Sequence, residues 1–156
     1  MRLRKIKNAQ ERLLDKLGLF IPNPEEYKRE WQKKFGNNNP IYIEIGMGKG
    51  KFIIEHAKRN KNINYIGIEK YDSVLIKGVE KASVEGLDNI YFLNVDAIKL
   101  CDYFKKGEVD KIFLNFSDPW PKTRHAKRRL TSEAFLKVYN NILDKKGDIE
   151  FKTDNI

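Results

Sequence analysis

From residue 41 onward, short apolar runs alternate with stretches of helical character, and this alternation constrains the fold more than any other feature. The apolar runs predict five strands, at residues 41–45, 64–69, 90–95, 111–116 and 148–151. The stretches between them predict helices at residues 51–59, 73–85, 97–104 and 132–143. A parallel pair of strands needs a crossover, which a helix provides. The pattern therefore predicts a doubly wound α/β fold, with a mostly parallel sheet covered on both faces.

The first 36 residues predict a basic helical extension that precedes the main domain, residues 37–156. Apolar positions near helical spacing, with lysines and arginines between them, predict an amphipathic helix ended by Gly18. These positions are Leu3, Ile6, Leu13, Leu14 and Leu17. The sequence Asn-Pro-Glu-Glu at residues 23–26 combines a cap, a first-turn proline and two acids, and predicts a second helix that runs to Gly36.

Composition narrows the functional class. The 156 residues suffice for one domain, and the absence of a secretory or membrane-spanning run predicts a cytoplasmic protein without membrane association. Cys101 is the only cysteine and there are two histidines, so we expect no disulfide and no metal site. The 31 Lys and Arg residues exceed the 22 Asp and Glu residues, which favours an anionic partner such as nucleic acid.

Residues 44–50, Glu-Ile-Gly-Met-Gly-Lys-Gly, follow the first predicted strand and resemble a ligand-binding loop. A phosphate-binding loop of the Walker type does not fit, because Phe52 follows Lys51 and Ile45 stands where the first glycine belongs. A dinucleotide fingerprint fails at its third glycine, where Lys51 stands. The spacing Glu-x-Gly-x-Gly-x-Gly is typical of class I methyltransferases and fits at every position. The alternative is a glycine-rich turn that binds no ligand.

Acidic residues follow or end the strands and form a second line of evidence. Glu69 ends the second strand, where a carboxylate can accept hydrogen bonds from both ribose hydroxyls. Asp96 follows the third strand, near the expected adenine amino group, and Asp118 follows the fourth. Each acid, taken singly, has helix capping as its alternative role. Together with Glu44 they favour a cationic adenosyl cofactor, S-adenosyl-L-methionine, at the carboxyl edge of the sheet.

A basic segment lies directly beyond Asp118. Residues 122–129 contain five Lys or Arg residues and no acid, and their place beside the expected reaction centre favours contacts with RNA phosphates. The alternative is a solvated surface. Trp120 either packs in the core or stacks on a base.

Four motifs resemble those of one family, the bacterial tRNA guanine-N7 methyltransferases. They are residues 44–50, Gly-Ile-Glu at residues 67–69, Ser-Asp-Pro-Trp-Pro-Lys-Thr-Arg-His-Ala-Lys-Arg-Arg-Leu at residues 117–130, and Phe-Lys-Thr-Asp-Asn at residues 151–155. The resemblance implies a Rossmann-like class I methyltransferase fold that uses S-adenosyl-L-methionine. It also implies methyl transfer to N7 of the variable-loop guanine, position 46 of tRNA.

The resemblance also implies residue roles. Cofactor contacts are expected from Glu44, Gly46, Gly48, Gly50, Glu69, Asp96 and Asp118, with Asp118 also the catalytic residue of the active site. Substrate contacts are expected from Lys122, Arg124, His125, Lys127, Arg128, Arg129 and Asp154. Family members continue beyond the Thr-Asp-Asn segment, whereas this chain stops at Ile156, so we expect the C-terminal strands to be missing. The alternatives are an RNA-binding fragment, an inactive methyltransferase-like module, or a methyltransferase acting on another basic substrate.

Overall fold

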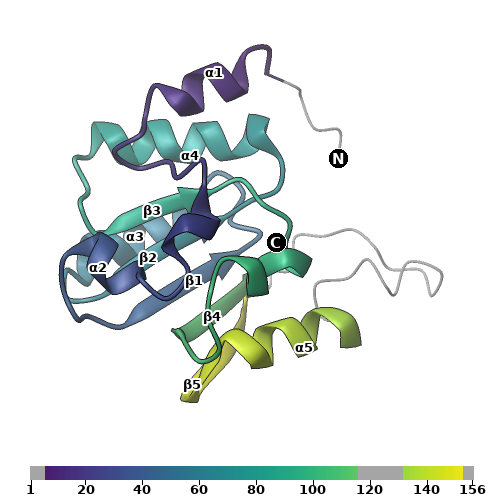
Figure 1. Cartoon of the computed structure of the whole chain (residues 1–156). Helices are drawn as coiled ribbons and strands as arrows, with labels where there is room; N and C mark the ends of the chain where they lie inside the picture. The colour runs from purple at the N-terminus through teal and green to yellow at the C-terminus, as the bar shows by residue number, and fades with distance from the viewer. Residues whose placement is uncertain (1–5, 116–131, 153–156) are drawn as a thin grey trace.

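Five parallel strands form the centre of the computed structural model, which describes residues 6–115 and 132–152 (Figure 1). The strands are β1 (Ile41–Ile45), β2 (Asn64–Ile68), β3 (Ile90–Leu93), β4 (Val109–Asn115) and β5 (Leu143–Lys152). Their order in the sheet is β3-β2-β1-β4-β5, and every neighbouring pair is parallel. The predicted doubly wound α/β fold is therefore confirmed.

The strand order reverses at β1. The chain proceeds outward from β1 to β2 and β3, and then returns to the other side of β1 to form β4. Glu44 of β1 accordingly pairs with Gly67 on one side and Phe113 on the other. Ligands of open α/β sheets bind beyond the carboxyl ends of the strands at such a reversal. The glycine segment that follows β1 lies at this point.

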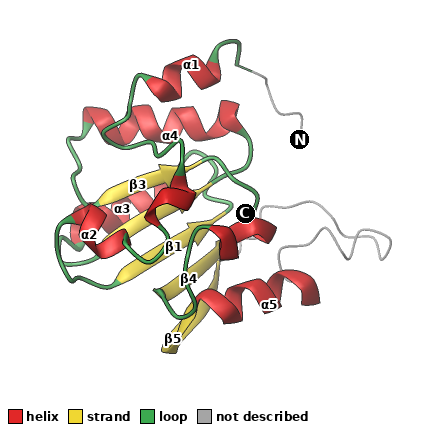
Figure 2. Cartoon of the chain, viewed as in Figure 1, coloured by secondary structure: helices red, strands yellow, loops and turns green. Residues whose placement is uncertain are grey.

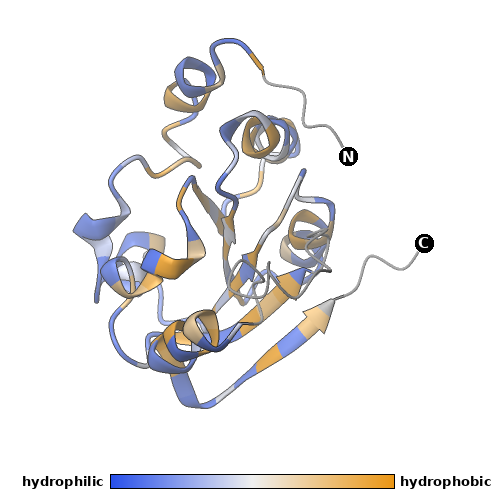
Figure 3. Cartoon of the chain, turned by 90° about the vertical axis from the view of Figure 1, so that its right-hand side faces the viewer, coloured by the Kyte–Doolittle hydropathy of each residue, from blue (hydrophilic) through white to orange (hydrophobic). Residues whose placement is uncertain are grey.

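Helices cover both faces of the sheet (Figure 2). The helices after β1 are α3 (Lys51–Arg59), α4 (Asp72–Val84), the 3₁₀ helix η2 (Ala97–Asp102) and α5 (Glu133–Ile142). Because alternate strand residues face opposite ways, two apolar cores form. Phe104 and Tyr139 belong to the core on the η2 and α5 side, whereas Ile54 and Leu75 belong to the core on the α3 and α4 side. In Figure 3, apolar residues concentrate in the strands and on the helix faces that pack against them.

The start of the N-terminal segment packs on the α4 side, and the chain then covers one edge of the sheet. Helix α1 (Ala9–Leu14) buries Ala9 and Leu13 and lies along α4 (Figure 1). The chain then runs beside β3, where the Ile21 N–H donates to the Phe92 carbonyl at 3.0 Å and the Phe92 N–H donates to the Leu19 carbonyl at 2.9 Å. These bonds satisfy backbone groups that an open edge strand would expose.

The second predicted helix is interrupted, so the prediction of one continuous helix to Gly36 was wrong. The structure contains the 3₁₀ helix η1 (Pro24–Tyr27) and a separate helix α2 (Trp31–Phe35). Between them, Arg29 adopts a left-handed φ of 77°. The Glu108 carboxylate accepts the backbone N–H groups of Arg29 at 3.0 Å and Trp31 at 3.3 Å, and so caps α2 from a distant part of the chain.

Other boundaries differ in smaller ways. The first helix ends at Leu14, which leaves Leu14 and Leu17 about half exposed, at 51% and 54%, instead of on a buried face. Residues 97–104 form a shorter 3₁₀ helix rather than an α-helix. Strand β5 begins five residues earlier than predicted, because Leu143 already pairs with Val109 before the chain bulges and resumes pairing at Asp148.

Candidate functional site

The glycine loop after β1 adopts a backbone conformation that suits glycine. Gly46, Gly48 and Gly50 have φ values of 75°, 60° and 82°, in the left-handed region that other residues enter only at a cost. The N–H groups of Gly46 and Met47 both donate to the carbonyl of Ile68, at 2.9 and 3.1 Å. The loop is therefore fixed to the end of β2, and helix α3 begins directly after Gly50.

Met47 anchors this loop in the protein interior. Its side chain is 3% exposed and lies in a slot formed by glycines from two other elements. A Cβ atom added to Gly67 of β2 would lie 2.4 Å from Met47 Sδ, and one added to Gly78 of α4 would lie 2.7 Å from Met47 Cε. Any larger residue at either glycine would overlap the Met47 side chain. The sequence motif identified the loop but not this anchor.

The outer side of the loop is open. Within the described part of the chain, no atom lies within 4 Å of a Cβ atom added to Gly48. The Gly48 N–H points to Glu69 and donates to Oε1 at 3.0 Å. The motif thus places an unobstructed stretch of backbone beside a carboxylate, an arrangement that lets a ligand pass close to the main chain.

Glu69 lies between the glycine loop and the start of α4. Its Oε2 accepts the N–H of Tyr71, the N-cap residue of α4, at 3.1 Å. The residue is 9% exposed, and burial raises the pKa of its carboxyl above the ordinary value, although the N–H donors of Tyr71 and Gly48 and the charge of Lys70 oppose this shift. The site therefore holds a carboxylate that is oriented by backbone N–H groups and whose pKa is raised by burial.

Two further acids that were predicted at the site, Asp96 and Glu44, lie in the described residues and occupy different environments. Asp96 is exposed and caps η2, because its Oδ1 accepts the Ile98 N–H at 3.1 Å. Glu44 is 1% exposed and lies within the layer between the sheet and its helices. The structure thus brings Glu69 beside the glycine loop, places Asp96 at the end of β3, and keeps Glu44 buried inside β1.

The remaining predicted site residues lie outside the described residues. They are Asp118, Lys122, Arg124, His125, Lys127, Arg128, Arg129 and Asp154. Trp120 lies outside them as well.

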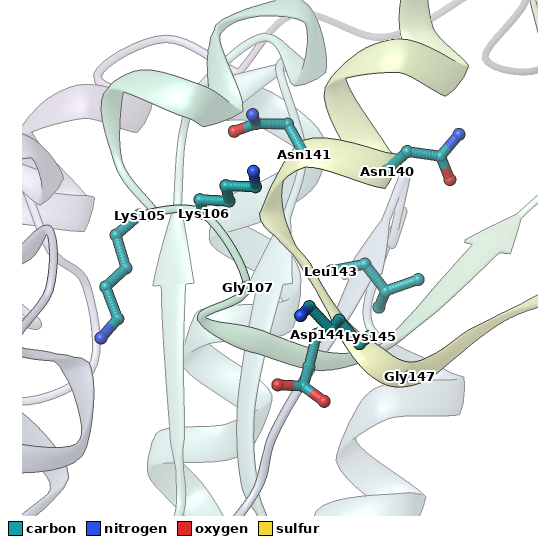
Figure 4. Close-up of a pocket in the computed structure, with 9 residues that line it drawn as sticks. All are labelled: Lys105, Lys106, Gly107, Asn140, Asn141, Leu143, Asp144, Lys145 and Gly147. Carbon is teal, nitrogen blue, oxygen red and sulfur yellow. The ribbon is translucent and has the colours of Figure 1, made fainter.

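A hollow is present at the amino-terminal ends of β4 and β5, whereas the glycine loop follows the carboxyl end of β1 (Figure 4). It lies between the turn before β4 and the junction of α5 with β5, and is lined by Lys105, Lys106, Gly107, Asn140, Asn141, Leu143, Asp144, Lys145 and Gly147. This amino-terminal edge is far from the glycine loop in the fold. Over residues 6–115 and 132–152, no group of three or more His, Cys, Asp or Glu side chains is arranged to hold a metal ion. Within the same ranges, no helix has the length and apolar character needed to span a membrane.

Sequence reasoning missed Asn94, which precedes Asp96 at the end of β3. Its side-chain amide donates to the backbone carbonyls of Glu69 and Lys70, both at 3.0 Å. An inspection of polar residues, and not only acids, at the strand ends would have identified it.

Comparison with known proteins gives concordant results. A family model described as a putative methyltransferase matches residues 38–156. A tRNA (guanine-N(7)-)-methyltransferase of Geobacillus sp. (strain WCH70) is 55% identical over 155 residues, which are 99% of this chain and 70% of that protein. A protein with the same name from Lachnoclostridium phytofermentans (strain ATCC 700394 / DSM 18823 / ISDg) is also 55% identical, over 99% of this chain and 72% of its own length.

Solved structures share the fold. The antibiotic-resistance methyltransferase Kmr superposes with a TM-score of 0.64 at 18% identity, over 81% of this chain and 65% of its own. A putative S-adenosyl-L-methionine-dependent methyltransferase from Methanococcus maripaludis gives a TM-score of 0.60 at 18% identity, over 98% of this chain and 67% of its own. At these identities the likeness concerns the fold alone.

Proposed function

The chain belongs to the tRNA (guanine-N(7)-)-methyltransferase family, and from this premise we propose that it methylates N7 of the variable-loop guanine at position 46 of tRNA. S-adenosyl-L-methionine is the proposed methyl donor. The observation that carries the proposal is the open glycine loop, whose Gly48 N–H is hydrogen-bonded to the Glu69 carboxylate at 3.0 Å.

The described residues fit this cofactor. A carboxylate offers about four lone-pair sites, and the N–H groups of Gly48 and Tyr71 occupy two of those on Glu69. The acceptor sites that the protein leaves unoccupied can receive hydrogen bonds from ribose hydroxyls. The open space at Gly48 lets the adjacent part of the ligand approach the backbone. We propose Gly46, Gly50, Glu44 and Asp96 as the other described contributors to this site.

The proposed chemistry needs little from a protein base. Guanine N7 carries a lone pair and no proton, so once the base is positioned it would form a bond to the methyl carbon as the bond from sulfur to that carbon breaks, and S-adenosylhomocysteine would leave as a neutral thioether. A positive charge then develops on the guanine. We propose that Asp118 orients the base and stabilises this charge, rather than removing a proton.

The basic segment supplies the proposed RNA contacts. Lys122, Arg124, His125, Lys127, Arg128 and Arg129 follow Asp118 closely in sequence, and Asp154 follows β5. Phosphate contacts of this kind position an RNA without reading its sequence. We propose the segment as the surface that holds tRNA while the guanine enters the site.

The test is methyl transfer from labelled S-adenosyl-L-methionine to two tRNA transcripts, one with guanine and one with adenine at position 46. We expect label only in the first transcript, with strand cleavage at position 46 after treatment that opens N7-methylguanine. Equal labelling of both transcripts would refute the proposed position. Absence of label, together with absence of cofactor binding, would refute the proposed activity.

A further inference from the structure

The turn that carries Glu69 is fixed by a side chain from the neighbouring strand. Asn94 follows β3, and its Nδ2 donates to the carbonyl oxygens of Glu69 and Lys70 at 3.0 Å each. Both hydrogens of this amide therefore bind one short stretch of backbone. Because the Glu69 carboxylate is held at its other end by Gly48 and Tyr71, its position depends on where this stretch lies.

Helix α1 adds a second constraint on the same turn. Gln10 Nε2 donates to Asn94 Oδ1 and to Asp72 Oδ2, each at 2.9 Å. Gln10 is separated from these residues by 84 and 62 positions in the chain, so only the docking of α1 brings it here. The Gln10 amide thus connects the end of β3 to the first residue of α4.

The position of Gln10 is fixed by the packing of its helix. The adjacent Ala9 is 3% exposed and Leu13, one turn later, is fully buried. The Ile6 N–H also donates to Ser73 Oγ at 2.7 Å, at the start of α4. Although Gln10 itself is exposed, these contacts hold it against residues 69–72.

We propose that Gln10 and Asn94 are positioning residues for cofactor binding. They hold residues 69–72 so that the Glu69 carboxylate faces the ribose hydroxyls, and α1 thereby contributes to the cofactor site although it lies outside the strand-end residues. This inference rests on the proposed function, since it takes the bound molecule to be an adenosyl cofactor. It assigns a role in binding to a residue of the N-terminal segment.

The chain offers a matched control for the alternative, in which Gln10 merely docks α1. Arg12 lies on the same helix and pairs with Glu80 of α4 through Nε, at 2.9 Å from Oε2, and through Nη2. Among the described residues, the hydrogen bonds of this pair do not extend to Asn94 or to residues 69–72. Arg12→Ala therefore removes one polar link between α1 and α4, while buried Ala9 and Leu13 and the Ile6–Ser73 hydrogen bond still hold the helix and Gln10 in place.

The experiment measures binding of S-adenosylhomocysteine by titration calorimetry to the whole chain and to its variants Q10A, N94A and R12A, with the melting temperature of each. We expect Q10A to raise the Kd about two- to tenfold, as for loss of one hydrogen bond, and N94A to raise it at least as much. R12A should leave the Kd within twofold. Because Gln10 acts largely through Asn94, the double variant should bind little worse than N94A.

Equal losses of affinity in Q10A and R12A would overturn the proposal, as would an unchanged Kd in Q10A. The Q10A variant places alanine at an exposed helical position, so its folding is expected to survive even where N94A fails to fold. An unaltered chain that binds no S-adenosylhomocysteine would overturn the proposed cofactor as well. Binding by the unaltered chain with equal losses in the two helix variants would overturn the positioning role alone.

Discussion

The slot that holds Met47 leads to a quantitative prediction for Gly67→Ala. The added Cβ would lie 2.4 Å from Met47 Sδ and 3.1 Å from Phe92 Cδ1, whereas nonbonded carbon atoms normally lie about 3.5 to 4.0 Å apart. Met47 cannot move away freely, because its Cε already lies against Gly50 and Gly78. The substitution must therefore displace the Met47 side chain or the loop that carries it.

The expected cost follows from two opposing effects. Overpacking a filled core costs about 1 to 3 kcal/mol, and replacing a strand glycine by alanine returns about 0.5 to 1 kcal/mol by restricting the unfolded chain. Because an approach of 2.4 Å is a severe overlap, we expect an overpacking cost of about 2 to 3 kcal/mol and hence a net loss of about 1 to 2.5 kcal/mol. For a chain of this length, that loss lowers the melting temperature by about 2 to 10 °C. Because the displaced loop is Gly46 to Gly50, affinity for S-adenosylhomocysteine should fall as well.

The assay is urea unfolding followed by circular dichroism, with Gly18→Ala as the control. Within residues 6–115 and 132–152, a Cβ at Gly18 meets nothing within 4 Å, so that variant should be as stable as the parent or slightly more stable. Met47→Ala removes the overlapping sulfur, so the double variant with Gly67→Ala should lose less stability than the sum of the two single changes. Additivity within about 0.5 kcal/mol, or a Gly67→Ala variant as stable as Gly18→Ala, would refute the slot.

Three further predictions concern single carboxylates. Burial raises the pKa of Glu69, so its carboxyl gains a proton at a higher pH than a solvated glutamate. Affinity for S-adenosylhomocysteine should therefore fall as the pH falls through that raised pKa. Calorimetry from pH 8 down to the ordinary glutamate value of 4.5 should show this fall for the parent and not for Glu69→Gln. Glu108→Ala removes the acceptor for the Arg29 and Trp31 N–H groups and should lower the free energy of unfolding, measured in urea, by about 1 to 2 kcal/mol. Glu108→Gln should have intermediate stability. Equal stability of the parent and the two variants would contradict the capping role. Asp118→Ala should lower the turnover of tRNA methylation much more than tRNA affinity, and equal losses in kinetics and in a filter-binding assay would argue against an orienting role.

The elements that the sequence predicted correctly are those with local signals. The bounds of β1 and α3 match the prediction, because a short run that is apolar except for Glu44 is followed by a glycine turn and then by a helix that Asn60 ends. The spacing of Gly46, Gly48 and Gly50 likewise identified the loop, whose three glycines all have positive φ values. In each case the determining residues are adjacent in the chain.

The features that the sequence could not predict depend on distant residues. The break before α2 depends on Glu108, which lies 77 positions beyond Trp31. Gly67 and Gly78 look like ordinary glycines inside a strand and a helix. Their requirement becomes clear only when the Met47 side chain is seen to lie between them. A glycine inside a regular element does signal a close approach, but it does not name the approaching group.

The acids at the strand ends show why capping and ligand binding are not alternative roles. Asp96 caps η2 through Ile98, and Glu69 accepts the N–H of Tyr71, the residue that precedes α4, so both carboxylates already bind backbone N–H groups at the start of the next helix. Backbone N–H donors orient a carboxylate and oppose its protonation, yet they leave part of its acceptor capacity unused. The backbone N–H donors therefore orient both carboxylates, which suits the proposed acceptance of hydroxyl or amino hydrogens from a ligand. Burial makes the charged form of Glu69 less favourable and so raises its pKa. The same low-dielectric surroundings strengthen each hydrogen bond that the carboxylate accepts.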